Sequence, residues 1–263
     1  MEITRMSVDR IAAFLASGNV TPEIIEEIKA DKRSTVARLI ESWQRRRKDL
    51  DKENERLKLL FEYERGFQQK GYHLIAGVDE AGRGPLAGPV VTAAVILPLD
   101  CKLNGINDSK KLSAKQRENL FRAISDTALA VCYTEVDVET IDKFNIYQAT
   151  ILGMYQSLRD LQVEPDAVLI DAVPLRKLAI PNLSIIKGDA LSASIAAASI
   201  VAKVKRDRLM DELDKEYPQY GFSRHKGYGT KEHIDALKKY GPCPVHRRSF
   251  APIKTWGTLF DED

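Results

Sequence analysis

Four acidic side chains stand where they could do chemistry. Asp79 and Glu80 directly follow an apolar run, Asp171 ends another, and Asp189 stands just ahead of a predicted helix. A charged group at the end of a buried strand is costly unless a ligand, commonly a metal ion, neutralises it. Taken singly, Asp171 can be an ordinary turn residue and Asp189 a helix cap. Gathered together, the four carboxylates would repel one another at neutral pH, and their oxygen-only ligands favour Mg²⁺ or Mn²⁺ over zinc.

A glycine-rich segment follows the first two acids. Gly82, Gly84 and Gly88 alternate there with Arg83 and with two prolines. Glycines let a backbone turn sharply or approach a ligand closely, and exposed amides in such a turn suit a phosphate. The simpler alternative is a hairpin whose glycines serve only the turn.

A second glycine-rich stretch, YGFSRHKGYGTKEH, lies in a basic part of the chain, because residues 203–254 hold more Lys and Arg than Asp and Glu. It predicts a flexible basic loop with Tyr228 at its tip. Basic charge supplies affinity for phosphates, and a tyrosine can stack on a nucleotide and hydrogen-bond a hydroxyl. Solvated helix faces give similar charge counts, however. We expect Tyr220 and Tyr240 to be packing residues.

Several of these strings resemble one known family. DEAGRGPLAGPVV, from Asp79, resembles the first signature of ribonuclease HII, the type 2 ribonuclease H family. DSKKLS from Asp108, KGDALSASIAAASIVAKVKRD from Lys187 and HKGYGT from His225 are similar to further motifs of the same family. The resemblance begins near Tyr72 and therefore says little about the residues before it.

The resemblance implies roles for individual residues. It implies that Asp79, Glu80, Asp171 and Asp189 bind divalent metal and form the catalytic acid set. It also implies that Gly82-Arg83-Gly84 and Tyr228 sense the ribose 2′-hydroxyl at an RNA-to-DNA step. The related ribonuclease HIII family has GKG at this place, so Arg83 favours ribonuclease HII.

Other polar residues in the similar motifs have open roles. In the family the loop around Lys110 lies near the active-site face, so Lys110 either meets a phosphate or remains a solvated lysine. Ser192, Ser194 and Lys203 are further candidates for phosphate contacts. His225, His233, Cys243 and His246 could be read as a zinc site, but their spacings fit no standard pairing.

The function implied by the resemblance is that of an endonuclease with a two-metal site for Mn²⁺ or Mg²⁺. It would hydrolyse the RNA strand of RNA–DNA hybrids and incise on the 5′ side of ribonucleotides embedded in duplex DNA, leaving 3′-hydroxyl and 5′-phosphate ends. The alternative is a non-catalytic hybrid-binding module. A module would be expected to have lost at least one of the four acids, and all four are present.

The elements that must position these residues alternate between apolar runs and amphipathic segments. We predict strands over 74–78, 90–97, 128–137, 167–172 and 183–186. We predict helices from a capping box at Ser113, over 138–162, from about Ser192, and over 234–240. The fold class is therefore α/β: a ribonuclease H-like mixed five-stranded sheet flanked by helices, over residues 73–263.

Residues 1–72 are predicted to form a helical extension. Ser7, Thr21-Pro22 and Ser34 are signals for helix starts, and Val36, Leu39, Ile40 and Trp43 fall on one helical face. The run RRRKDLDKENERLK follows. Arg45–Arg47 could touch a nucleic acid or a partner, but a charge run of mixed sign is more often a solvated helix, and we favour that interpretation. An additional scaffold role of these helices stays open.

Composition sets the remaining expectations. The net charge is +2 and 44% of the residues are hydrophobic, which is enough for a core. Three scattered cysteines, Cys101, Cys132 and Cys243, favour a reducing compartment. No apolar run approaches the ~20 residues of a membrane span, and MEITRMSVDR lacks a signal-peptide core. We therefore expect a cytoplasmic monomer without a membrane partner, and a replication clamp is a possible protein partner.

Overall fold

The computed structural model describes residues 5–18, 20–99 and 101–256. The chain forms two compact units, residues 1–56 and 57–263. The second contains the four predicted catalytic acids and is therefore called the catalytic unit. The break after Arg56 differs from the predicted division at residue 72. The reason is that Leu57, Leu60 and Phe61 belong to the same apolar cluster as the main sheet and helix of the catalytic unit.

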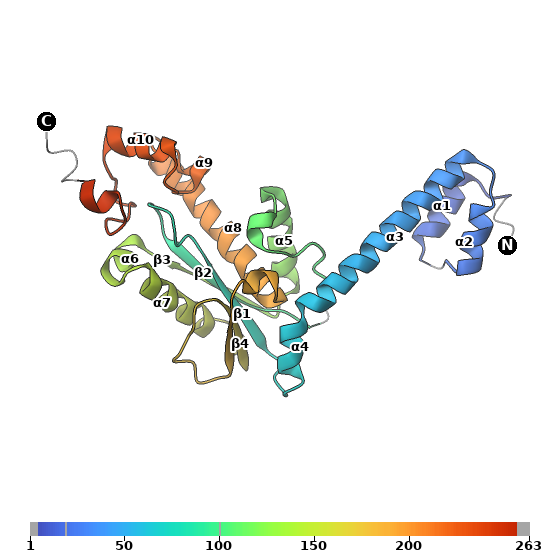
Figure 1. The fold of residues 1–263 in the computed structure, drawn as a ribbon, viewed down its shortest axis with the longest axis horizontal. Coiled ribbons are helices and arrows are strands. Elements are labelled where there is room, and N and C mark those ends of the chain that lie inside the picture. The colour runs from blue at the N-terminus through green and yellow to red at the C-terminus, as the bar shows by residue number, and fades with distance from the viewer. Residues whose placement is uncertain (1–4, 19, 100, 257–263) are drawn as a thin grey trace. The chain divides into compact units, whose positions relative to one another are not determined.

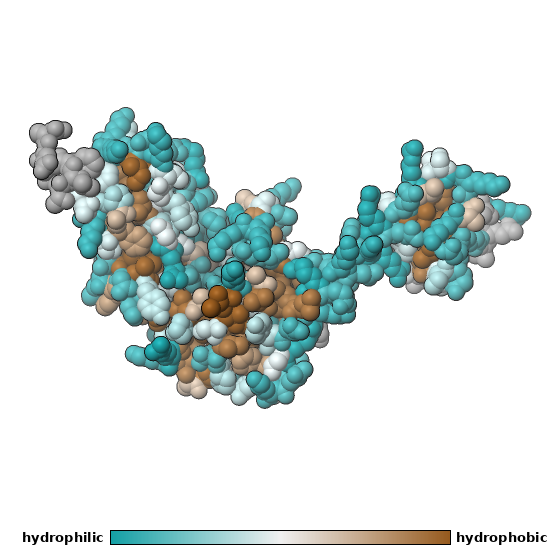
Figure 2. Space-filling view, in the orientation of Figure 1, coloured by the Kyte–Doolittle hydropathy of each residue, from teal (hydrophilic) through white to brown (hydrophobic). Residues whose placement is uncertain are grey.

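The first unit is helical, as predicted. It contains α1 (Val8–Ala16), α2 (Pro22–Lys29) and most of α3 (Ser34–Leu60) (Figure 1). Ser7 caps α1 by accepting a hydrogen bond from the Arg10 amide, whereas Ser34 is already the first helical residue of α3. The unit has its own buried apolar cluster, made of Ile11, Leu15, Ile28, Val36 and Ile40. Arg45–Lys48 are exposed, and Figure 2 shows the middle of α3 covered by hydrophilic side chains.

The catalytic unit is built on one mixed sheet of five strands, which confirms the predicted fold class. The strands are β1 (Ile75–Ala81), β2 (Val90–Ile96), β3 (Ala130–Val136), β4 (Ala167–Asp171) and β5 (Asn182–Ile185). Their order is β3-β2-β1-β4-β5. β1, β2 and β3 pair antiparallel, whereas β4 pairs parallel to both β1 and β5. β1 runs through Ala81, so the first two acids lie inside its end and not beyond it.

Helices cover both faces of this sheet (Figure 1). α8 (Ala193–Glu216) and α5 (Ala114–Thr127) pack on one face, and α7 (Ile146–Arg159) packs on the other. The predicted helix over 138–162 was wrong as one element. It is divided into α6 (Val138–Phe144) and α7, because Asn145 takes a positive φ of 70° and its side chain caps α7. The remaining elements are α4 (Glu62–Gln68), α9 (Phe222–His225), α10 (Lys231–Tyr240), and short 3₁₀ turns at Ser109–Lys111, Gly188–Ala190 and Ile253–Thr255.

Close packing of α8 on β1 fixes the depth of the site. A Cβ at Gly77 would overlap the backbone of Ser194, so only glycine lets the helix approach this strand. The small residues Ala196, Ala197 and Ala198 continue the buried contact surface. The sequence prediction of an alanine-lined helix packed against the sheet is thereby confirmed.

Candidate active site

Asp79 and Asp171 are brought side by side by strand register. β1 and β4 are parallel, and their last paired residues are Val78 and Ile170. The next residue on each strand is an aspartate, and side chains at matching positions of neighbouring strands leave the same face of a sheet. For Asp79 this is the face of Gly77, which α8 covers. The two carboxylates therefore lie at adjacent strand ends beneath the start of α8.

Asp189 reaches the same place from the turn that precedes α8. It lies in the 3₁₀ turn Gly188–Ala190 and is buried. The Gly188 amide donates a hydrogen bond of 2.7 Å to Asp171 Oδ1, which ties this turn to the end of β4. Three of the predicted acids, from β1, β4 and the turn before α8, are thus gathered by the fold.

Glu80 is placed differently. Strand alternation starts its side chain from the face opposite to that of Asp79. Its Oε1 accepts a hydrogen bond of 3.2 Å from Arg83 Nη1. Its other oxygen, Oε2, is buried without a hydrogen-bond partner. An orphaned carboxylate oxygen beside other acids is the state expected of a group that meets a cation only when a ligand binds.

The pKa values of three of these acids are raised by burial and by the crowding of negative charge. Burial, followed by repulsion from Glu80 and Asp171, raises the pKa of Asp79 well above its ordinary value. Burial also raises the pKa of Glu80, although Arg83 opposes the shift. For Asp189, burial and then the nearby Asp108 and Asp171 raise the pKa. The cluster therefore crowds acids whose mutual repulsion is offset only in part by Arg83 and Lys110.

A divalent cation suits this donor set by its chemistry, since the ligands are all oxygens and one of them is orphaned. Within residues 5–18, 20–99 and 101–256, however, no group of three or more His, Cys, Asp or Glu side chains is arranged as a ready coordination shell. The same finding applies to His225, His233, Cys243 and His246. Two of the carboxylates are engaged with other groups, Asp171 with the Gly188 amide and Glu80 with Arg83.

The glycine loop (residues 82–89) and the tyrosine loop (residues 225–230) lie against each other. The Leu86 amide donates to Gly227 O at 2.8 Å. A Cβ on Gly84 would lie 3.6 Å from Cε1 of Tyr228, so the tyrosine ring lies beside the predicted ribose-sensing glycines. Tyr228 is 47% exposed and free to meet a ligand. The structure thus brings together two motifs that are more than a hundred residues apart.

The tyrosine loop is more constrained than predicted. His225 is buried, and its Nε2 is hydrogen-bonded to Tyr220 O at 2.8 Å. Lys226 is paired with Asp211. The expectation of a freely basic, flexible loop was therefore wrong for these two residues. Tyr220 is buried as expected, whereas Tyr240 is half exposed and contacts the edge of the Tyr220 ring and the Lys239 ammonium group.

Lys110 lies at the edge of the acid cluster, with Nζ 3.9 Å from Asp189 Oδ2 and most of its side chain exposed. The other candidates for phosphate contacts are buried or paired, and Ser194 Oγ is buried without a hydrogen-bond partner. Ser192 Oγ donates to the buried Glu64 at 2.6 Å, and the Ser194 amide donates to the same carboxylate at 2.8 Å. Lys203 is paired with Asp207 at 2.6 Å. Of these residues only Lys110 is placed to reach a substrate.

Two buried arginines were missed by the sequence analysis. Arg206, on α8, and Arg247 are among the largest fully buried side chains of the described residues. Both donate to backbone carbonyls of the glycine loop. Arg206 could have been suspected, because it falls four residues after Ala202 and four before Met210, on the buried stripe of its helix. Nothing in the run HRRSF separates Arg247 from a surface arginine.

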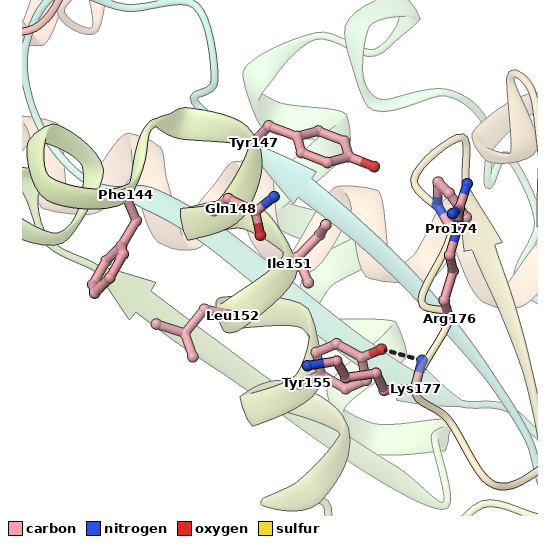
Figure 3. Close-up of a pocket in the computed structure, with 9 residues that line it drawn as sticks. All are labelled: Phe144, Tyr147, Gln148, Ile151, Leu152, Tyr155, Pro174, Arg176 and Lys177. Carbon is pink, nitrogen blue, oxygen red and sulfur yellow. Dashed lines mark hydrogen bonds between the residues drawn. The ribbon is translucent and has the colours of Figure 1, made fainter.

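A separate groove lies on the α7 side of the sheet (Figure 3). Its volume is about 620 Å³, and it is lined by α7, by Phe144 and by the segment after β4. Tyr155 accepts a hydrogen bond of 2.8 Å from the Lys177 amide across it, as Figure 3 shows. None of its lining residues is a predicted site residue, so the groove is not part of the acidic cluster.

Similar proteins with solved structures share this fold. Ribonuclease H2 from Pyrococcus horikoshii is 28% identical, with a TM-score of 0.63 over 72% of this chain and 99% of that one. Ribonuclease HII from Archaeoglobus fulgidus, solved in a complex with PCNA, is 27% identical, with a TM-score of 0.57 over 66% of this chain and 93% of that one. Bst-RNase HIII, solved in complex with Mn²⁺, is 19% identical, with a TM-score of 0.55 over 74% and 73% of the two chains, and shares the fold. Fold and relatives together define an enzyme of ribonuclease H type.

Sequence comparison is more specific. The family model described as Ribonuclease HII matches residues 76–253, and that of the Ribonuclease HII N-terminal domain matches residues 7–68. Proteins named Ribonuclease HII from Enterococcus faecalis and Bacillus licheniformis are 53% and 52% identical, over 92% and 88% of this chain and 94% and 90% of theirs. The chain belongs to the ribonuclease HII family. Among its described helices, none is long and apolar enough to cross a membrane.

Proposed function

We propose that this enzyme hydrolyses the RNA strand of RNA–DNA hybrids and incises duplex DNA on the 5′ side of embedded ribonucleotides. The products would carry 3′-hydroxyl and 5′-phosphate ends. The observation that carries the proposal is the proximity, within one unit, of an acidic cluster with one orphaned carboxylate oxygen, Glu80 Oε2, and a glycine loop in contact with the exposed Tyr228. The first arrangement suits phosphodiester hydrolysis, and the second suits recognition of a ribose.

We assign metal binding to Asp79, Glu80, Asp171 and Asp189. Divalent ions, Mg²⁺ or Mn²⁺, would supply activation of water and stabilisation of developing negative charge when they are bound. The protein's own part is orientation: the Gly188 amide holds Asp171, and Arg83 holds Glu80 through one oxygen only. Glu80 therefore keeps one oxygen for a further partner.

Substrate recognition is assigned to Gly82, Arg83, Gly84 and Tyr228. Amides of the glycine loop and the Tyr228 hydroxyl would contact the 2′-hydroxyl, which is the group that separates RNA from DNA. Lys110 would contact a backbone phosphate, since its ammonium group is exposed and close to Asp189. Arg83 is partly exposed and could exchange its contact with Glu80 for a phosphate.

The test uses a DNA duplex carrying a single ribonucleotide, incubated with Mg²⁺, Mn²⁺ or EDTA. We expect incision 5′ of the ribonucleotide with either metal and none with EDTA, and Tyr228→Phe should lower the rate on this substrate more than it lowers thermal stability. Binding of the duplex without metal-dependent incision would instead support a non-catalytic hybrid-binding module.

The partner and location of the enzyme are further proposals. The PCNA complex of the Archaeoglobus relative motivates a binding test with a replication clamp, using the full-length chain. We also propose that the enzyme is a cytoplasmic monomer. Sedimentation of the purified protein would show a mass near 29.5 kDa if this is correct.

A further inference from the structure

Arg206 and Arg247 are buried cations whose hydrogen bonds all go to backbone carbonyls, and Arg247 also lies over the Phe250 ring. Each is at most 1% exposed. Among the described residues, no carboxylate lies within 4.0 Å of either guanidinium group. Burial lowers the pKa of Arg206 to about 10 and that of Arg247 to about 9, so both remain charged at neutral pH. Burying a charge in this way is costly unless many charge-assisted hydrogen bonds offset it.

The acceptors of Arg247 lie within the glycine loop. Its Nη2 donates to Gly82 O at 2.6 Å and its Nη1 donates to Arg83 O at 2.9 Å. Carbonyl and amide point in opposite directions across a trans peptide. Turning the Gly82 and Arg83 carbonyls towards Arg247 therefore directs the amides of Arg83 and Gly84 away from it. Within the described part of the chain neither amide has an acceptor, so both can donate to a ligand.

Arg206 joins the glycine loop to the tyrosine loop. Its Nε donates to Pro89 O at 3.0 Å and its Nη2 to Ala87 O at 3.1 Å. Its Nη1 donates to Lys226 O at 3.0 Å, two residues before Tyr228. The guanidinium group is planar and rigid, so these three bonds fix the separation of the two loops.

A histidine chain fixes the other side of the tyrosine loop. His233 Nδ1 lies 2.9 Å from Tyr228 O and must donate, because a carbonyl only accepts. In neutral His233, Nε2 is then an acceptor, so His246 Nε2, 3.0 Å away, is the donor. His246 Nδ1 in turn accepts from the Cys243 amide at 3.0 Å. One neutral tautomer of each ring therefore accounts for all these hydrogen bonds. His246, the last ring of this series, is the residue next to Arg247 in the sequence.

We propose that Arg206 and Arg247 are positioning residues that set selectivity for a ribonucleotide in DNA without touching it. The inference rests on the proposed function. Arg247 aims the Arg83 and Gly84 amides, and Arg206 holds Tyr228 at a constant distance from them. Recognition of one 2′-hydroxyl at an RNA-to-DNA step requires both sets of donors at once, whereas a continuous RNA strand offers many registers.

The test compares kcat/KM on two substrates, a DNA duplex with one ribonucleotide and an RNA–DNA hybrid. Arg206→Lys and Arg247→Lys keep the charge but lose the planar fork. We expect kcat/KM on the single-ribonucleotide duplex to fall roughly 10- to 100-fold, the effect of a small misplacement of contacting groups, and the loss on the hybrid to be several-fold smaller. Arg208→Lys is the matched control, because this exposed arginine on the same helix pairs with Glu118 and should keep the wild-type ratio.

A second variant keeps the inference open to refutation if a Lys variant does not fold. A Cβ at Gly227 would lie 2.5 Å from Ala87 O, so Gly227→Ala pushes the two loops apart without changing either arginine. This variant should lower the ratio of kcat/KM on the single-ribonucleotide duplex to kcat/KM on the RNA–DNA hybrid. In addition, Arg206→Lys combined with Tyr228→Phe should lose less than the product of the single losses, because both act through one contact.

The outcomes separate the inference from the proposed function. Wild-type enzyme that fails to incise the single-ribonucleotide duplex would refute the proposed function itself. If the wild type incises it, but the folded variants lose activity equally on both substrates in step with a lower Tm, the arginines are merely structural and the inference is overturned. An unchanged ratio in Gly227→Ala would overturn it as well.

Discussion

Asp79, buried, and Asp171, partly buried, are carboxylates at the ends of β1 and β4, whereas Arg206 and Arg247 are buried guanidinium groups beneath the glycine loop. Both pairs bring like charges together in the interior of the catalytic unit. The arginines are satisfied, since the guanidinium group of each donates to three backbone carbonyls. The acids are not: the pKa of Asp79 is raised well above its usual value by burial and by its acidic neighbours, and Glu80 Oε2 has no partner.

Buried charges with complete and with incomplete hydrogen bonding have different consequences for stability and for ligand binding. A buried charge whose hydrogen bonds are complete stabilises the fold, and its removal leaves buried donors or acceptors without hydrogen bonds. A buried charge whose interactions are incomplete marks a place where a ligand completes them. Variants of the acids and variants of the arginines should therefore behave differently.

Asp79→Asn should abolish cleavage while preserving the fold. Loss of one charged ligand at the reacting centre should lower kcat by at least roughly 10²–10³-fold, by analogy with loss of one electrostatic donor. The measurement is single-turnover cleavage of a hybrid with Mg²⁺ or Mn²⁺. Asp235→Asn, which removes an exposed acid paired with Lys231, is the control and should leave kcat unchanged. Full activity of Asp79→Asn would refute its role.

Arg247→Met, unlike Asp79→Asn, should lower the stability of the fold. It leaves the carbonyls of Gly82, Arg83 and Gly88 without their donor, at about 1–3 kcal/mol for each group that stays buried and unpaired. Urea denaturation should show a free energy of unfolding lower by several kcal/mol. In the same assay and without metal, Asp79→Asn should be at least as stable as the wild type, because it relieves repulsion. A lower free energy of unfolding in both variants would contradict the contrast between the acids and the arginines.

Divalent metal should stabilise the wild type. Mg²⁺ or Mn²⁺ at about 100 times its Kd would raise the free energy of unfolding by about 2.7 kcal/mol. The increase should be visible as a higher Tm and should be absent or much smaller in Asp79→Asn. A Tm that rises equally in both proteins would place the ion elsewhere.

Acid should weaken the histidine chain that supports Tyr228. Burial lowers the pKa of both His233 and His246 from 6.5 to about 4. The unfolded chain therefore takes up protons at a higher pH than the folded one, so this contribution to stability is complete above pH 6.5 and is lost as the pH falls towards 4. The raised carboxylate pKa values act in the opposite direction, so the effect must be read as a difference between proteins.

The comparison protein for this measurement is His246→Gln, which removes one titrating group. Its Tm should fall less between pH 7 and pH 5 than that of the wild type, by roughly 2–4 °C for each kcal/mol of difference. His73→Gln is the control, because His73 is exposed and its replacement should leave the pH dependence unchanged. Identical slopes in all three proteins would show that the buried rings do not contribute.

Much of the catalytic unit follows from local patterns in the sequence. The apolar runs that end at Asp79 and Asp171 predict two buried strands, and the capping box at Ser113 predicts α5. The single predicted helix over 138–162 failed because Asn145 can adopt a left-handed conformation and start a second helix, which periodicity alone does not reveal. The long-range partners were equally hidden: Glu64 accepts a hydrogen bond from Ser192, which the sequence offers only as a candidate for a phosphate contact.

Residue types and local patterns identify the groups that could do chemistry: three acids at the ends of apolar runs, Asp189 ahead of a helix, a glycine loop and a tyrosine between glycines. Which of these groups meet depends on the tertiary fold. The parallel register of β1 and β4 places Asp79 beside Asp171, and Arg206 joins two loops that are far apart in the chain. The physical reason is that residue type and periodicity are local properties, whereas the neutralisation of a buried charge depends on whatever side chain or carbonyl the rest of the fold brings to it.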